Sequence, residues 1–361
     1  MPFGGLQRGF LRIAEICMAR NNTVDVYAGS WEGGIPDGLN VEILPVRGFT
    51  NHRRCESFAK ILGKTLSARQ YDVVVGFNKM PGLDIYFASD TCYAAKAFSK
   101  SFWYRMTGRC QSYLRLERAV FDKRLKTKIL LISENEKSYF INYYGTAEER
   151  FYLLPPGISK DCLSPPNADA IRMELRNELG VRLDQNIVLM VGSGFRTKGV
   201  DRAILGINSL PPGLREKTIL LIAGKDNSRP FRRLAKRSKV AEQVRFIGGR
   251  DDIPRFLVAA DLLIHPAYRE NTGNVLIEAM ASGLPVLVTD VCGYSNHIKS
   301  AAAGEIVSSP FKQETLNRFL YSMLTSDKKE FWQQKGKDYI ACNDVFSRAE
   351  KAADIIEQAA R

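Results

Sequence analysis

Short apolar runs alternate with helix-length stretches along the N-terminal half of the chain. The runs have the length of buried strands, and they cover residues 24–27, 41–46, 73–77, 129–132 and 152–154. A helical pattern over 57–66 separates the second run from the third. Alternation of this kind predicts parallel βαβ units in a doubly wound sheet, with ligands at the carboxyl ends of the strands.

The second half repeats the pattern. We expect helices over 200–209 and 253–260, and strands over 187–191, 218–224, 244–250, 262–264 and 286–288. Paired prolines at 155–156 and 165–166 interrupt the alternation and are typical of a linker. The prediction is an α/β fold of two Rossmann-like domains facing a cleft, over 1–156 and 157–340, followed by a C-terminal helical segment over 341–361.

The helical pattern that begins at Leu6 has no strand before it. In a Rossmann-like unit a glycine-rich turn such as Gly4-Gly5 follows a buried first strand, which places the turn's backbone against a phosphate. Two explanations stay open: the start site is placed too late, or the N-terminal domain lacks its first strand. Gly4 and Gly5 themselves are either a phosphate turn or an N-terminal tail turn.

Bulk composition narrows the function class. A chain of 361 residues exceeds the usual size of one core, and the net charge of +13 favours polyanionic partners or an anionic membrane. The seven scattered cysteines are expected to be reduced thiols, because no Cys-x-x-Cys pair occurs. No signal peptide or membrane-spanning run is evident, so a cytoplasmic or peripheral protein is expected.

The segment 93–121 interleaves aromatic and basic residues and contains one acid. Aromatic rings and cations on one helix suit the headgroup region of an anionic membrane, although an ordinary core-facing helix with basic solvent positions fits too. The membrane-surface candidates are Trp103, Tyr104, Arg105, Arg109 and Arg115. Just before the segment, Asp90 is either an acceptor-side base or the capping residue of the following helix.

Two loops of the second half carry candidate chemistry. The turn over 192–199 follows a strand and ends in cations, Arg196 and Lys198, that suit a diphosphate leaving group. The strand at 244–250 ends in glycines and Arg250. Because glycine has no side chain, we expect a nucleotide base to lie against the backbone at Gly249.

The stretch 267–286 is the strongest signal. Glu270 follows a strand, a helix is expected to begin at Asn271, Thr272 or Gly273, and Glu278 lies about two turns into it. Free amides of the first helical turn favour phosphate, and two flanking carboxylates can hold sugar hydroxyls.

In this context the Glu-x7-Glu spacing resembles the signature of family 4 retaining glycosyltransferases of the GT-B fold. Residues 2–8, 75–84, 151–158, 198–202 and 260–293 are similar to one group within it, the lipopolysaccharide core glucosyltransferases, which add a hexose to an inner-core heptose. The resemblance implies that 1–156 faces the acceptor and the membrane, that 157–340 binds the UDP-sugar, and that the last helix crosses back to the first domain.

The same resemblance implies a set of site residues. The implied donor contacts are Gly4 and Gly5 on the diphosphate, Lys198 on the phosphates, Glu270 on the sugar, the amides of Asn274 and Val275 on phosphate, and Glu278 on ribose. Asp90 would lie in the cleft. Thr197 stands where the family places an arginine, and Arg196 is a possible replacement.

The implied reaction is hexose transfer from a UDP-sugar, with glucose expected, and with retention of configuration through same-face attack. We expect metal independence, because no Asp-x-Asp motif occurs, and no cofactor, because the UDP-sugar is a substrate. The expected location is the inner face of the inner membrane. The alternatives are a nucleotide-sugar epimerase of the same fold, a disabled membrane-bound relic and, on charge alone, a nucleic-acid binder.

Overall fold

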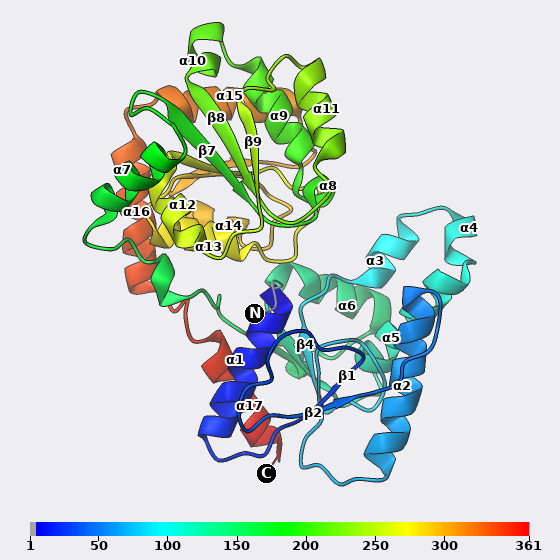
Figure 1. Cartoon of the computed structure of the whole chain (residues 1–361). Coiled ribbons are helices and arrows are strands. Elements are labelled where there is room, and N and C mark those ends of the chain that lie inside the picture. The colour runs from blue at the N-terminus through cyan, green and yellow to red at the C-terminus, as the bar shows by residue number, and fades with distance from the viewer. Residues whose placement is uncertain (1–4, 361) are drawn as a thin grey trace. The chain divides into compact units, whose positions relative to one another are not determined.

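The computed structural model describes residues 5–360, and the chain divides into two compact units. The first unit comprises Met1–Gly157 with Ser347–Arg361, and the second comprises Ile158–Phe346. The chain therefore leaves the first unit near its paired prolines and returns to it for the last helix (Figure 1).

The first unit contains parallel strands and the helices that cover them. Its elements are α1 (Gly5–Ala19), β1 (Asp25–Ala28), β2 (Asn40–Ile43), α2 (Asn51–Ser67), β3 (Val75–Gly76), β4 (Ile85–Ala88), α3 (Tyr93–Phe98), α4 (Phe102–Arg105), α5 (Gly108–Phe121), β5 (Lys128–Leu131), α6 (Lys137–Tyr144), β6 (Phe151–Leu153) and α17 (Arg348–Ala360). No strand precedes α1 among the residues that the structure describes. The predicted strand at 73–77 is shorter, and the fully buried strand β4 was not predicted.

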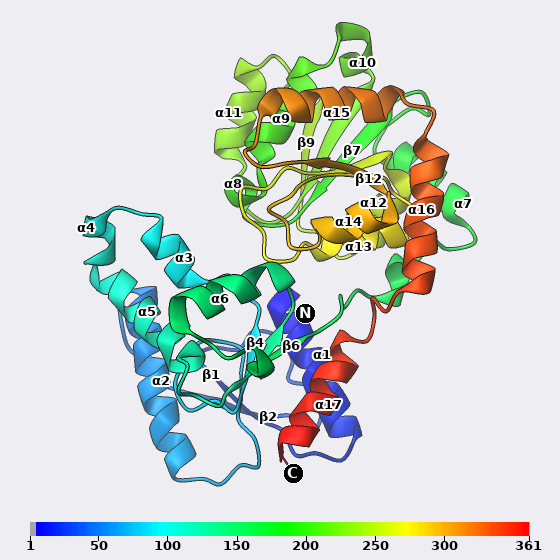
Figure 2. The ribbon, with the colours of Figure 1, turned by 180° about the vertical axis from the view of Figure 1, so that it is seen from behind.

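These strands form two separate sheets. One is the pair β1-β2 and the other has the order β3-β4-β5-β6, and all pairings are parallel. Helices α1 and α17 pack on one face of the larger sheet, around Ile13, Phe87 and Ile356. The other face packs against α2, α5 and α6, around Tyr86 and Phe121 (Figure 2).

The second unit is a complete parallel sheet between two helical layers. Its elements are α7 (Ala168–Glu178), β7 (Asn186–Val191), α8 (Phe195–Lys198), α9 (Val200–Ser209), α10 (Pro212–Glu216), β8 (Thr218–Ala223), α11 (Arg229–Arg237), β9 (Val244–Gly248), α12 (Ile253–Ala259), β10 (Leu262–His265), α13 (Asn274–Ala281), β11 (Val286–Thr289), α14 (Ser295–Ala301), β12 (Gly304–Val307), α15 (Gln313–Thr325) and α16 (Lys329–Cys342). The strand order is β12-β11-β10-β7-β8-β9. The helix expected over 200–209 has those bounds, and β12 was not predicted.

Candidate active site

The sheet order of the second unit brings two loops together. Strands β7 and β10 are hydrogen-bonded neighbours, yet the chain leaves β7 toward β8 on one side and leaves β10 toward β11 on the other. Such a reversal of strand order opens a crevice at the carboxyl ends of the strands. The loops after these strands, over 192–199 and 266–273, both start at that edge and carry Lys198 and Glu270.

Three ionisable side chains meet at this crevice. The Lys198 ammonium forms an ion pair with the Glu270 carboxylate. His265, the last residue of β10, is buried, and its Nε2 lies 3.4 Å from Oε2 of Glu270. Lys198 and Glu270, which were predicted on two loops of one site, are therefore in direct contact, and His265 is a third member that the sequence pattern did not reveal.

Burial controls the charge state of this cluster. Desolvation lowers the pKa of Lys198. Desolvation, and secondarily the Lys198 charge, lowers the pKa of His265 to about 3, so its imidazole is neutral at physiological pH. Neither ring nitrogen of His265 makes a hydrogen bond to the part of the chain described, which leaves both available to a ligand hydroxyl.

The backbone holds the two loops against each other. Gly199 has φ +79°, and a Cβ there would lie 2.1 Å from the carbonyl oxygen of Pro266, so only glycine fits. The amide of Tyr268 donates to the carbonyl of Thr197 at 2.8 Å. Arg202 donates to the Pro266 carbonyl at 3.1 Å, and its guanidinium lies 3.5 Å from the centroid of the Tyr268 ring. These contacts fix the position of Glu270 relative to Lys198.

Helix α13 starts at the last of the three predicted positions. Its N-cap is Gly273, at φ +93°, and not Asn271 or Thr272. Asn274 is the first helical residue, so Glu278 is the fifth and lies little more than one turn into the helix. Glu278 is half-buried, and the first-turn amides of Asn274 and Val275 are at the N-terminus, where phosphate is favoured.

The predicted turn over 192–199 contains one helical turn, α8. The helix leaves Arg196 exposed while Lys198 is half-buried and paired with Glu270, so Arg196 does not join the buried cluster. After β9, Arg250 donates to Asp252 at 2.8 and 2.6 Å. The Lys225 side chain packs against Gly249: a Cβ at position 249 would lie only 2.7 Å from Cγ of Lys225. Donor binding by Arg196, Gly249 and Arg250 stays a prediction.

The candidates of the first unit are spread over two elements. Gly4 lies outside the described residues, and Gly5 begins α1. Asp90 is exposed in the loop that follows β4. Its alternative role as the cap of α3 is wrong, because the carboxylate of Glu117 accepts the amides of Tyr93 and Ala94 at 2.7 and 2.8 Å. The acceptor-side role of Asp90 stays a prediction.

The aromatic and basic segment is not one helix. Ser101 and Thr107 cap α4 and α5, and divide the segment into α3, α4 and α5, because each accepts an amide three residues later. Four apolar side chains are exposed on α3 and α4 and directly after them: Phe98, Phe102, Trp103 and Met106. Trp103, at 79 % exposure, is the most accessible of them. We call this set the α3–α4 patch.

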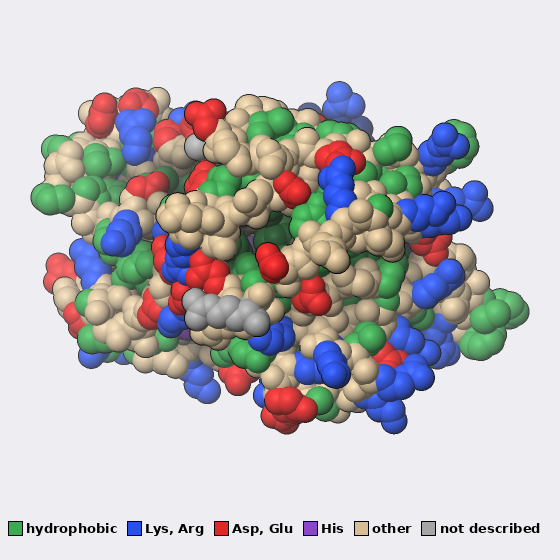
Figure 3. Space-filling view, turned by 90° about the horizontal axis from the view of Figure 1, so that it is seen from below, with side chains coloured by type: hydrophobic (Ala, Val, Ile, Leu, Met, Phe, Trp, Pro, Cys, Tyr) green, Lys and Arg blue, Asp and Glu red, His purple; other side chains and the backbone are tan. Residues whose placement is uncertain are grey.

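Cations border the α3–α4 patch. The Arg105 guanidinium lies 5.2 Å from the ring centroid of Phe98, and Arg109 lies 5.9 Å from that of Tyr113. Tyr104 is half-buried and hydrogen-bonds Tyr93, whereas Arg115 is paired with Glu56 on α2. Figure 3 shows Lys and Arg side chains gathered on the side of the first unit where α2, α3 and α4 lie.

Residues 5–360 contain neither a metal-binding cluster nor a membrane-spanning helix. No group of three His, Cys, Asp or Glu side chains there could hold a metal ion. No helix of this part of the chain is long and apolar enough to cross a bilayer.

Known proteins resemble both units. The family model for glycosyl transferases group 1 matches residues 171–338, which include Lys198, His265, Glu270 and Glu278. The chain is 44% identical, over 98% of its length, to lipopolysaccharide glucosyltransferase WaaG of Escherichia coli K12, of which 96% is covered. It is 25% identical to D-inositol 3-phosphate glycosyltransferase of Thermobifida fusca, over 58% of this chain and 49% of that protein.

Solved structures agree with these relatives. The crystal structure of WaaG, a glycosyltransferase involved in lipopolysaccharide biosynthesis, matches with a TM-score of 0.94 and covers 99% of this chain and 97% of that one. Anabaena HepE in complex with UDP and glucose matches in fold, with a TM-score of 0.75 at 18% identity, over 99% and 97% of the two chains. The chain therefore belongs to the glycosyl transferases of group 1 and is a glycosyltransferase of the GT-B fold.

Proposed function

We propose that this enzyme transfers a hexose, with glucose as the expected sugar, from a UDP-sugar to an inner-core heptose of lipopolysaccharide. The observation that carries the proposal is the 44% identity to a lipopolysaccharide glucosyltransferase over 98% of the chain. That similarity extends through both units, so it includes the acceptor side as well as the donor side. The UDP-sugar is a substrate, and the proposal needs no cofactor.

The donor half of the reaction is assigned to the crevice between β7 and β10. An incoming diphosphate favours the charged form of Lys198, whose pKa burial lowers, and draws its ammonium from Glu270. The Glu270 carboxylate is then free to accept hydrogen bonds from the sugar. The first-turn amides of α13 add positive potential for the leaving UDP.

Retention follows from attack on the face that UDP leaves. The sequence offers no convincingly placed enzymic nucleophile, so the heptose hydroxyl attacks the anomeric carbon while the bond between that carbon and the phosphate oxygen breaks, and the hydroxyl proton passes to the departing phosphate. Lys198 and the α13 amides stabilise the charge that develops on the phosphate. The neutral His265 imidazole lies 3.4 Å from Glu270 without a hydrogen bond to it, and its role in the proposal is to hold a sugar hydroxyl beside that carboxylate.

The acceptor is part of a lipid, and the α3–α4 patch suits its surroundings. Exposed rings of Phe102 and Trp103 enter the headgroup region while Arg105 and Arg109 meet anionic groups. The proposal therefore includes a peripheral enzyme on the inner face of the inner membrane, with the acceptor-binding unit nearest the lipid.

The test measures UDP release from UDP-glucose with and without a heptosylated inner-core acceptor, in a buffer that contains EDTA. Release that depends on the acceptor and persists in EDTA is expected. Glu270→Gln should lower kcat/KM by at least hundredfold, because one preorganised polar contact to the reacting group contributes about 2.7–4 kcal/mol. The matched control is Glu314→Gln, an exposed glutamate of α15 in the same unit, which should leave the rate unchanged.

Other outcomes would overturn parts of the proposal. Conversion of UDP-glucose to another UDP-hexose without acceptor would identify an epimerase. Absence of any turnover by a folded protein that binds UDP would indicate a disabled relic. Wild-type transfer by the Glu270 variant would refute the site.

A further inference from the structure

Helix α11 carries its cations in the pattern that a helix of the core normally uses for its apolar residues. The cations recur at i, i+3, i+4, i+7 and i+8, and all of them are exposed: Arg229, Arg232, Arg233, Lys236 and Arg237. At 3.6 residues per turn this spacing confines them to an arc of roughly 140° on one side of the helix. We call these five residues the α11 basic face.

The opposite side of α11 anchors it to the second unit. Ala235 is buried, and Phe231 and Leu234 pack against the same hydrophobic cluster. The helix also contacts α9, and it lies at the rim of its unit in both Figure 1 and Figure 2. The cations are therefore displayed from a packed helix, with their spacing fixed by its backbone.

No carboxylate on the same stretch of chain balances this charge. Residues 227–241 contain six cations, the sixth being Lys239, and no acid. Arg232 donates to the Ser228 hydroxyl at 3.3 Å and lies 4.8 Å from the Phe246 ring centroid, so its contacts are uncharged. Within residues 5–360 the ion pairs of the second unit use other cations, which are Arg172, Arg176, Arg182, Lys198, Lys217, Arg250 and Arg255.

This arrangement costs the helix stability. Like charges four positions apart on a helix repel one another. The α11 basic face contains three such pairs: Arg229 with Arg233, Arg232 with Lys236, and Arg233 with Arg237. A concentration of charge that destabilises its own helix, and that has no partner carboxylate in the described chain, indicates an anion outside the protein.

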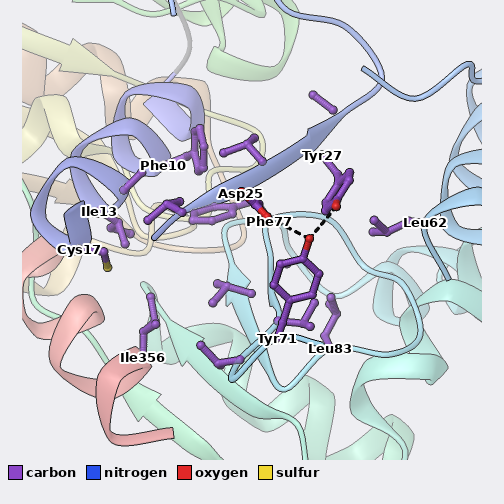
Figure 4. A pocket seen from close by; sticks show the side chains of 18 of the residues that line it. Phe10, Ile13, Cys17, Asp25, Tyr27, Leu62, Tyr71, Phe77, Leu83 and Ile356 are labelled. Carbon is purple, nitrogen blue, oxygen red and sulfur yellow. Dashed lines mark hydrogen bonds between the residues drawn. The ribbon is translucent and has the colours of Figure 1, made fainter. Parts of the chain in front are cut away.

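The cavity of the first unit offers no alternative site for an anion. It has a volume of about 850 Å³ and lies among α1, β1, β3 and α17 (Figure 4). Its lining contains Asp25, Asp72 and Glu357 but no Lys, Arg or His. In Figure 4 the Tyr71 hydroxyl donates to the Asp25 carboxylate at 3.1 Å and lies 2.7 Å from the Tyr27 hydroxyl. An anion would meet like charge there, so polyanions are left to the surface of the molecule.

The surroundings of the α11 basic face narrow the choice of partner. Protein interfaces have an apolar centre, and single-stranded nucleic acid stacks its bases on exposed aromatic rings. Between Leu205 and Tyr268, a stretch that the structure describes throughout, no large apolar side chain is exposed. An anionic bilayer needs neither feature, and a cluster of about four to eight Lys or Arg on an amphipathic helix is typical of proteins that bind one.

We propose that the α11 basic face docks the second unit onto an anionic phospholipid surface, as a contact distinct from the α3–α4 patch of the first unit. The choice of a lipid rests on the proposed function, in which the acceptor is itself part of a lipid. Because no large apolar side chain accompanies the cations, the contact stays at the level of the headgroups, and salt reverses it.

The test uses the whole protein in a background that disables the α3–α4 patch through Trp103→Ser, Arg105→Gln and Arg109→Gln. Co-sedimentation is measured with vesicles of phosphatidylglycerol and phosphatidylcholine in a one-to-three mixture, at about 50 mM salt, where screening is moderate. The background protein should still bind these vesicles. It should not bind vesicles of phosphatidylcholine alone, and about 1 M salt should release it.

Within that background, Arg233→Gln, Lys236→Gln and Arg237→Gln together should weaken the partition coefficient at least about thirtyfold, since each cation near the bilayer contributes about fivefold. Thermal unfolding should be unchanged, because all three side chains are exposed and glutamine is a good helix former. The matched control removes the same charge from dispersed, exposed positions of the same unit, with Arg318→Gln, Lys328→Gln and Lys335→Gln. Its binding should fall less than about threefold, because charges beyond a Debye length from the bilayer are screened.

Several outcomes would overturn the proposal. They are absence of vesicle binding by the background protein, an equal loss in the control, and binding of duplex DNA in place of vesicles through the same three cations. Hexose transfer to a detergent-dispersed acceptor is measured in parallel, and the α11 variant should retain it; loss of transfer would assign these cations to the substrate site instead. Vesicle binding requires no glycosyl transfer, so failure of the docking surface and failure of the proposed function are separate results.

Discussion

Glu117 is predicted to hold the first unit together at the start of α3. Its carboxylate is fully buried and accepts five hydrogen bonds, four from nitrogen and oxygen donors and a longer one, at 3.8 Å, from the Cys92 thiol to Oε2. Oε1 accepts from Lys79 Nζ at 2.6 Å and the Tyr93 amide at 2.7 Å. Oε2 accepts from the Ala94 amide at 2.8 Å and the Tyr144 hydroxyl at 2.7 Å.

Glu117→Gln keeps the side-chain volume and replaces one of the two acceptor oxygens with an NH₂ group. In either orientation the new NH₂ group faces at least two donors, because a glutamine offers one acceptor oxygen. One orphaned pair includes Lys79, whose side chain is only 11% exposed. Each orphaned donor costs about 1–3 kcal/mol, and breaking a buried ion pair costs about 3–5 kcal/mol in total. We expect the first unit to lose roughly 3–5 kcal/mol of unfolding free energy.

The assay is urea unfolding followed by the fluorescence of Trp31, which lies in the first unit, in a background with Trp103 and Trp332 replaced by phenylalanine. The control is Glu148→Gln, whose 73%-exposed carboxylate pairs with Lys137, and which should cost under about 1 kcal/mol. A Glu117→Gln variant whose unfolding free energy lies within about 1 kcal/mol of that of its parent would refute the reasoning.

Three more predictions concern pH, backbone and membrane. The pKa of His265 is about 3 in the folded protein and about 6.5 in the unfolded chain, so on acidification the unfolded chain binds a proton first. The unfolding free energy of the second unit, measured by urea unfolding, should therefore fall by roughly 2 kcal/mol between pH 7 and pH 5. Gly199→Ala should destabilise far more than Gly180→Ala, since both positions have left-handed φ but only Gly199 meets a carbonyl oxygen, at 2.1 Å; thermal unfolding tests the pair. Charge reversal at Arg105 and Arg109 should each weaken binding to anionic vesicles at least about fivefold, and co-sedimentation measures this binding.

Each of these has an outcome that contradicts it. A pH dependence unaltered by His265→Gln would show that other groups cause it. Equal destabilisation at the two glycines would mean that φ, and not the close approach, decides. Unchanged vesicle binding would contradict the membrane role of the α3–α4 patch. Transfer to a detergent-dispersed acceptor serves as the control: if it is unchanged, the two arginines act only in membrane binding.

The local pattern of apolar and polar residues was sufficient to predict many helices and strands of the second unit. The helix at Val200–Ser209 is strongly amphipathic, and the buried strand at Leu262–His265 is uniformly apolar up to its last residue, so periodicity identified both. The resemblance assigned Lys198 and Glu270 to one donor site, whereas their direct ion pair required coordinates. Gly273, the cap of α13, was one of three expected starting positions; the preference for Asn and Thr at caps favoured the other two, and the backbone at φ +93° decides for glycine.

Other features depend on contacts between residues far apart in the chain. Glu117 was visible only as the single acid of a basic segment, and its partner Lys79 lies 38 positions away. His265 carried one weak signal, a histidine directly before proline at the end of a strand, and its role appears only when Glu270 lies beside it. The interrupted sheet of the first unit could be expected from the absent strand, but the open edges at β1 and β3 required coordinates.

The return of α17 to the first unit has a consequence for synthesis on the ribosome. Its contacts with α1, and with Arg20 directly after α1, which lies 2.8 Å from Asp354 and 3.1 Å from Glu357, cannot form until the last residues are translated. The second unit, Ile158–Phe346, is continuous and can fold as it emerges. At about 5–20 residues per second its translation takes roughly 10–40 s. Throughout that interval the apolar surface around Ile13 and Phe87 lacks its α17 cover, and such transiently exposed surface is prone to aggregation.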